Sequence, residues 1–341
     1  MSTVLSIIAA LVILSIFVVI HELGHYGAGR LLGFKIVEFA VGMGPRLLSR
    51  EKNGTIYSLR AFPIGGMCQF YGEDKPIVDA KSFASHKVWK RMLVILAGPV
   101  MNILAAIFFA VILLTAYGEF VPQIVALSDE NAPAAQAGLL PGDIIRGVDG
   151  KSVDFYGQVT DYIKAANSEK TVITVVRGGD KIDITVYNIF NAEANRNMLG
   201  VQLDYIRSSF TFFEAVVGSV KYVWYIVQQM LSFLVGIFSH GVKSGEVAGP
   251  VGTISIIGQA VRLGLEPVLT LVVLISVNLG IVNLLPIPAL DGGRLVFLTI
   301  EGIRRKPIPP DKEGIVHFIG FVLLIGLIIL LTVIDISNLF G

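Results

Sequence analysis

The sequence is poor in cysteine and in charged residues. Its 341 residues include one cysteine, Cys68, so no intramolecular disulfide can form and any part outside the cytoplasm must fold without one. Charged residues make up only 16%, whereas a soluble domain carries about a quarter. The net charge of +1 gives no indication of a nucleic-acid partner. Hydrophobic residues make up 54% and fall in long runs, which predicts a membrane protein.

Four apolar segments are predicted to cross the lipid bilayer. A spanning helix needs about 20 residues, and the runs of this length lie at about 4–28, 92–117, 268–292 and 316–337. No Lys or Arg precedes the first run and no small-residue cleavage site follows it, so we expect a retained span and not a signal peptide.

The distribution of basic residues predicts the orientation. Lys and Arg are frequent in 30–91 and again in 304–312, and positive loops stay in the cytoplasm. Both termini and the stretch after the second span are therefore expected outside. A further span at 212–238 would break this alternation, and that segment contains Glu214 and Lys221. We interpret 212–238 as an amphipathic helix on the outer membrane surface.

Two regions between the spans have strand patterns. Residues 33–72 alternate in polarity and are interrupted by glycines, which predicts a cytoplasmic-side β element that dips toward the membrane. Its three strands are expected at 35–41, 55–62 and 67–71. Residues 120–205 predict a small β-rich domain, with a hairpin turn at Asp149-Gly150. The fold class is thus a polytopic α-helical membrane protein with about four spans, a β element and an inserted β domain. The expected divisions are 1–117 with the first two spans, 120–205 with the β domain, 206–267 with the surface helix and a linker, and 268–341 with the last two spans.

The segment HELGH, at the end of the first span, has the pattern of a metal site. His21 and His25 are four residues apart, so both project from one face of a helix. That spacing suits two imidazoles that bind one zinc ion, with Glu22 placed to take a proton from an attacking water. Three ionisable groups in an apolar span cost on the order of 2–3 kcal/mol each by insertion scales. Metal binding explains them better than a structural polar cluster does.

A catalytic zinc needs a third protein ligand and one open position. Asp291 is the candidate, since it lies in a segment broken by proline and glycine inside an apolar run, NLLPIPALDGG at 283–293. The first and third spans both run from outside to inside and both carry their polar groups near the cytoplasmic end. Asp291 and HELGH are therefore expected at similar depth in the membrane. Asn283 could bind the substrate backbone or stabilise an oxyanion. It could equally satisfy backbone groups freed at the break.

HELGH, the NLLPIPALDGG segment and the inserted β domain, together with AGPVMN (97–102) and GPVGTISI (249–256), resemble the site-2 protease family of intramembrane zinc metalloproteases. The resemblance is to the bacterial RseP/RasP type, here with room for one PDZ domain. It implies that His21, His25 and Asp291 bind one zinc ion per chain and that Glu22 is the catalytic base. It also implies that Asn283, with the loop at Gly65-Gly66, holds the substrate.

The implied function is regulated intramembrane proteolysis in the bacterial inner membrane. Expected partners are the lipid bilayer and single-span substrates, such as anti-sigma factors or remnant signal peptides. Peptide C-termini are further candidates at the PDZ-like domain, near GLLPGD (138–143). Two alternatives are an ion or metal transporter and an inactive PDZ scaffold. Transporters often show inverted repeats, which do not stand out here, and the intact His-Glu-His-Asp set argues against the scaffold.

Overall fold

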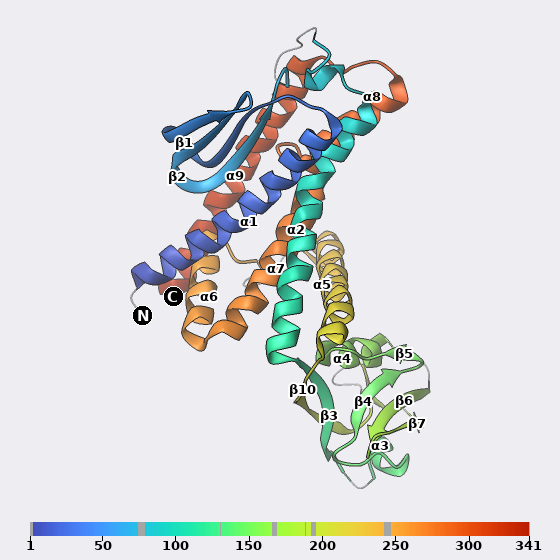
Figure 1. Ribbon diagram of the computed structural model, residues 1–341. Coiled ribbons are helices and arrows are strands. Elements are labelled where there is room, and N and C mark those ends of the chain that lie inside the picture. The colour runs from blue at the N-terminus through green and yellow to red at the C-terminus, as the bar shows by residue number, and fades with distance from the viewer. Residues whose placement is uncertain are drawn as a thin grey trace. The chain divides into compact units, whose positions relative to one another are not determined.

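The computed structural model describes residues 3–73, 79–129, 131–165, 169–187, 189–191, 196–241 and 247–340. They form two compact units, one of residues 1–110 with 223–341 and one of residues 111–222. The longer helices are α1 (Thr3–Leu32), α2 (Val88–Tyr117), α5 (Phe212–His240), α6 (Pro250–Leu263), α7 (Leu265–Leu284), α8 (Asp291–Arg304) and α9 (Pro310–Phe340). Figure 1 shows the path of the chain through them.

Among the described residues, five helices are long and apolar enough to cross a membrane: α1, α2, α5, α7 and α9. α1, α2 and α9 contain three of the predicted spans, and α7 covers the first part of the span predicted at 268–292. The fifth, α5, covers the segment that we expected on the membrane surface, and its length and composition would also allow it to cross. The count of four spans therefore stays a prediction.

The third predicted span, 268–292, is too long. α7 ends at Leu284, and Leu285 has the extended conformation φ −62°, ψ 142°. Proline disfavours the helical conformation in the residue before it and lacks a backbone N–H, so Pro286 ends the helix. Asp291 consequently begins the short helix α8 and does not lie in a spanning helix. The sequence interpretation also missed α6, in the stretch that we took as a linker.

The predicted β element consists of two long strands, β1 (Ile36–Lys52) and β2 (Thr55–Phe70), where we expected three separate ones. Each strand bends back, so that residues 38–41 of β1 align both with 56–59 and with 66–69 of β2. The strands bend near Gly42, which has a φ of 85° that favours glycine. The element packs against α1 within the same unit.

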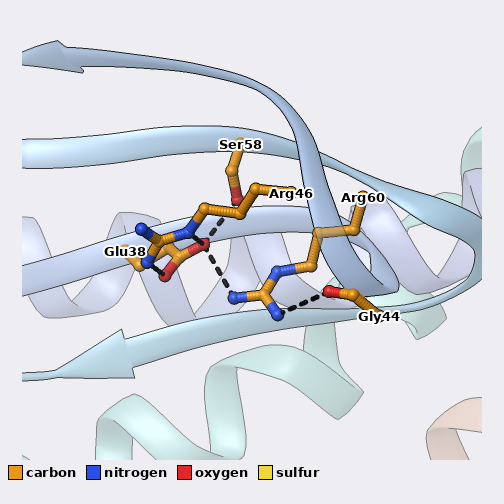
Figure 2. A network of polar contacts seen from close by, with 5 residues as sticks. All are labelled: Glu38, Gly44, Arg46, Ser58 and Arg60. Atoms are coloured by element: carbon orange, nitrogen blue, oxygen red, sulfur yellow. Dashed lines mark hydrogen bonds and ion pairs between the residues drawn. The ribbon is translucent and has the colours of Figure 1, made fainter.

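A buried ion network holds the bend (Figure 2). The Glu38 side chain is 2% exposed and accepts hydrogen bonds from Arg46 at 2.5 Å, Ser58 at 2.5 Å and Arg60 at 2.9 Å. Arg60 also donates to the Gly44 carbonyl at 3.1 Å. Burial alone would raise the pKa of Glu38, but these bonds lower it to about 2. The carboxylate is therefore charged at neutral pH and ties three parts of the bent sheet together.

The unit of residues 111–222 contains an antiparallel β domain with helices α3 (Pro133–Gln136) and α4 (Tyr156–Ala165). Its sheet has the order β10-β3-β4-β6-β7, and β5 pairs with β4. The strands are β3 (Glu119–Leu127), β4 (Ile144–Val148), β5 (Lys151–Ser152), β6 (Lys170–Arg177), β7 (Asp180–Tyr187) and β10 (Val201–Ser208). A separate pair joins β8 (Ile189–Asn191) to β9 (Arg196–Met198).

The local predictions for this domain are confirmed. Asp149 and Gly150 both have positive φ, 48° and 73°, as the tight turn between β4 and β5 requires. The GLLPGD loop is fixed by Asp143, which is 1% exposed and receives two hydrogen bonds of 2.7 Å from Arg177. Burial favours the neutral acid, yet the bonds from Arg177 lower the pKa of Asp143.

Candidate metal centre

The HELGH residues lie in the second half of α1, which ends where Gly33 takes the left-handed conformation at φ 86°. His21 and His25 lie one turn apart and are both buried at 8% exposure. Their rings meet edge to face with centroids 4.7 Å apart, so both Nε2 atoms point to one place. The predicted face of the helix is confirmed by this geometry.

Asp291 brings the third donor to that place from the first turn of α8. Its Oδ2 atom lies 3.0 Å from His21 Nε2 and 3.3 Å from His25 Nε2, and the two nitrogens are 3.1 Å apart. Ligands at 2.0–2.2 Å from a tetrahedral zinc stand roughly 3.3 Å from one another. Among the described residues these three form a group that could hold a metal ion, and their spacing fits zinc.

Glycines make room for this arrangement. A Cβ atom added to Gly98 of α2 would lie 2.4 Å from His25 Nε2 and 2.8 Å from His21 Nε2, inside the space where the donors meet. A Cβ atom at Gly24 would lie 2.2 Å from the carbonyl oxygen of Ala97. The glycine within HELGH therefore lets α1 approach α2 closely, and Gly98 keeps the metal position open.

The second nitrogen of each imidazole also has a partner on α2. His25 Nδ1 lies 2.9 Å from the carbonyl oxygen of Val94, so it donates its proton there and leaves Nε2 with a free lone pair. His21 Nδ1 lies 3.3 Å from Nδ2 of Asn102, which is fully buried, and Oδ1 of Asn102 has no hydrogen-bond partner among the described residues. Metal binding by His21 Nε2 requires the imidazole proton on Nδ1. Rotation of the Asn102 amide, which exchanges Nδ2 and Oδ1, lets Oδ1 accept that proton.

Glu22 contacts the β element. A Cβ atom at Gly66 would lie 2.8 Å from Glu22 Cγ, so the bare backbone of Gly66 admits this side chain. Glu22 and Cys68 of β2 line the same cavity as the three donor residues. Glu22 is therefore in the cavity beside the donors, where a general base for water attack must lie.

A cavity of about 610 Å³ joins all the predicted site residues. Its lining includes His21, Glu22, His25 and Asp291, and also Asn283, Gly65 and Gly66. The structure thus brings together every residue that the sequence singled out, and their roles stay predictions. The sequence interpretation missed the importance of Gly24, Gly98 and Val94, because a glycine or a backbone carbonyl in an apolar helix carries no distinctive signal.

Two imidazoles, a carboxylate and a neighbouring glutamate in a partly enclosed cavity are the parts of a zinc-dependent hydrolase. Zinc held by this set would polarise a carbonyl group and make hydroxide available at neutral pH. Glu22 would hold and pass the proton, and the cavity wall would exclude bulk water. The chemistry that this constellation suits is the hydrolysis of a peptide bond.

Comparison with known proteins identifies the class. The chain belongs to peptidase family M50, whose family model matches residues 9–327. Zinc metalloprotease RasP of Shouchella clausii is 32% identical over 100% of both chains. RasP of Geobacillus kaustophilus is 28% identical over 99% of both chains. The protein is therefore a zinc metalloprotease of the site-2 protease group and a multi-pass membrane protein, which rules against the transporter and the inactive scaffold.

Among solved structures, one weak match covers about a quarter of the chain. A PDZ domain of an SdrC-like protein from Listeria innocua aligns with 26% of this chain and 97% of its own. The TM-score is 0.23 and the identity is 20%, a similarity too low to assign a fold.

Proposed function

We propose that this protease binds one zinc ion through His21, His25 and Asp291 and cuts single-span substrates within their membrane segment. The proposal rests mainly on one observation. His21, His25 and the candidate base Glu22 lie on α1, a helix apolar enough to span the bilayer. A peptide bond reaches these groups only if the substrate comes to the same depth.

The β element offers a way to open a helical substrate. A peptide bond in a helix is shielded by its own hydrogen bonds, so it must become extended before attack. In the part of the chain that the structure describes, residues 66–70 pair with β1 on one side only, and they line the cavity on the other. An extended substrate can add there as a further strand. Gly65 and Gly66 have no side chains that would keep its backbone away.

Within this proposal each residue has a separate task. Glu22 takes a proton from the attacking water and gives it to the leaving amine. Asn283 lines the cavity from the last turn of α7, where its amide can donate to the substrate carbonyl. Met43 contacts Gly65, since a Cβ atom on that glycine would lie 2.8 Å from the Met43 Cε atom. The bend held by Glu38 therefore supports the loop beside the catalytic base.

The test separates metal binding from chemistry. Purified wild type, Glu22→Gln and the control Glu266→Gln are placed in vesicles with a labelled single-span substrate, and zinc is measured by elemental analysis. We expect about one zinc per chain in all three, cleavage within the span by wild type and control, and none by Glu22→Gln. Full activity of Glu22→Gln, or a cut mapped by mass spectrometry outside the span, would contradict the proposal.

For orientation, we propose that both termini and the β domain lie outside the bacterial inner membrane, as the basic loops indicate. The middle of α6 lies against the beginning of α1, because a Cβ atom at Gly258 would be 2.8 Å from the Ser6 side chain. A crossing α5 would force the chain after it to recross the bilayer before α6. Thiol labelling with an impermeant reagent in a Cys68→Ser background tests this. A cysteine at the exposed Ser152 should react in intact cells, and one at the exposed Ser85 should react only after the membrane is permeabilised.

We also propose that the β domain at 120–205 binds peptide ends left by an earlier cut, in the manner of a PDZ domain. The supporting feature is the GLLPGD loop, which Asp143 and Arg177 hold rigid. The proposed substrates are anti-sigma factors and remnant signal peptides. Peptides with a free C-terminal carboxylate should bind better than amidated copies, and equal binding would reject this part of the proposal.

A further inference from the structure

The loop at 285–290, which leads from α7 to Asp291, is held in an unfavourable backbone conformation. Ala289 has a φ of 76°, in the left-handed region that a residue with a Cβ atom rarely adopts. Such a residue keeps this conformation only where surrounding contacts impose it. Because Ala289 lies two positions before Asp291, whatever holds Ala289 also sets where the carboxylate of Asp291 points.

His317 of α9 makes the contact that holds Ala289. The backbone N–H of Ala289 donates to His317 Nδ1 at 2.8 Å. This bond requires Nδ1 to be an acceptor, so the imidazole proton is on Nε2, which lies 3.8 Å from the Glu313 carboxylate. The Phe297 ring packs beside the imidazole with centroids 5.5 Å apart. Besides this bond, the Phe297 ring fixes the His317 side chain, whereas Nε2 has no hydrogen-bond partner in the described part of the chain.

A second contact from α9 lies one turn further on. A Cβ atom at Gly320 would be 2.6 Å from the carbonyl oxygen of Pro288 and 2.5 Å from its Cβ atom. Gly320 therefore lets the backbone of α9 touch the residue just before Ala289. Two successive loop residues, Pro288 and Ala289, are held by residues three positions apart on one helix face.

We propose that His317 is a positioning residue for the metal centre: through Ala289 it keeps Asp291 at ligand distance from His21 and His25. The inference rests on the proposed zinc function and adds a residue that no motif predicts. Without the acceptor at position 317, Ala289 returns toward a right-handed conformation and the start of α8 shifts. A zinc site tolerates only about 0.2 Å of ligand displacement.

The test is zinc affinity, measured on detergent-solubilised protein by competition with a chelating dye. His317→Leu removes the acceptor, and we expect the affinity to fall by about 10–100-fold, as for other groups that orient metal ligands. His317→Asn keeps an acceptor near the position of Nδ1 and should stay close to wild type. Ala289→Gly in the His317→Leu background removes the cost of the left-handed conformation, so about fivefold of the affinity should return.

Phe318→Leu is the matched control, because Phe318 is next in sequence and 66% exposed, and its zinc affinity should equal that of wild type. If His317→Leu misfolds, Gly320→Ala tests the same loop from the neighbouring turn and should also weaken zinc binding. Wild-type zinc affinity in folded His317→Leu would overturn the inference, as would equal losses in His317→Leu, His317→Asn and the double variant. Absence of zinc binding by the wild type would instead overturn the proposed function.

Discussion

Gly98 offers a sharp test of the metal centre, because the change needed is a single methyl group. Gly98→Ala places a Cβ atom 2.4 Å from His25 Nε2 and 2.8 Å from His21 Nε2. Contacts this short do not persist, so the imidazoles must move. We expect Gly98→Ala to abolish zinc binding and proteolysis although every ligand is still present.

The magnitude follows from the distances. To reach a contact of even 3.0 Å, the His25 ring must retreat by about 0.6 Å, three times the roughly 0.2 Å that a zinc site tolerates. Disturbing a group that only orients a ligand costs about 10–100-fold in metal affinity. Displacing the donor itself should cost at least about 100-fold. In an ordinary helix position the same substitution would stabilise by about 1 kcal/mol, so the expected effect opposes the usual trend.

The assay measures zinc affinity by chelator competition and thermal unfolding with and without zinc. Gly27→Ala is the control, because Gly27 lies on α1 beside HELGH and a Cβ atom there has no heavy atom within 4 Å. The control should bind zinc as the wild type does and unfold at the same or a slightly higher temperature. If Gly98→Ala bound zinc with wild-type affinity, the placement of the donors around Gly98 would be refuted.

Two further predictions concern the groups around the site. Asn102→Leu removes the acceptor for the His21 Nδ1 proton and should lower zinc affinity by about 10–100-fold. Asn102→Asp keeps an acceptor and should bind zinc well. Similar zinc affinities of the two variants in calorimetry would count against the bond between Asn102 and His21. Glu38, with its pKa lowered to about 2, stabilises the fold fully above its ordinary pKa of 4.5, and this contribution is lost as pH falls toward 2. Wild type should therefore lose thermal stability relative to Glu38→Gln between those values, and parallel unfolding curves would show that the network contributes nothing.

The sequence was sufficient for the parts of the site that follow from local periodicity. His21 and His25 share a helix face by spacing alone, and Asp291 follows from a polar residue in a proline-broken apolar run. The end of α7 at Leu284 could also have been predicted, since Pro286 and Pro288 cannot continue a helix. The helix α6 carried a signal too, because Pro250 occupies the favoured first position of a helix.

The parts that the sequence could not predict depend on contacts between elements far apart in the chain. Gly98 is one of several glycines in apolar helices, and only the approach of α1 shows which of them borders the donors. His317 is 26 residues from Asp291 in sequence, and nothing in the pattern of α9 indicates that it bonds Ala289. The strands β1 and β2 were divided into three because glycines that usually end strands here only bend them.

The polar groups of the centre also join the helices that carry them, so metal binding and helix packing should not vary independently. Asn102 contacts His21 of α1 through its side chain, and its backbone carbonyl accepts a 2.6 Å hydrogen bond from Ser276 of α7. Both Asn102 and Ser276 are fully buried. In an apolar surrounding, an unpaired polar group costs more than it does in water, so each hydrogen bond of this series stabilises the contact of two helices. Zinc, by fixing His21, would strengthen the α1–α2–α7 contact as well as supply the chemistry. Substitutions of His21, Asn102 or Ser276 should therefore lower zinc affinity and thermal stability together.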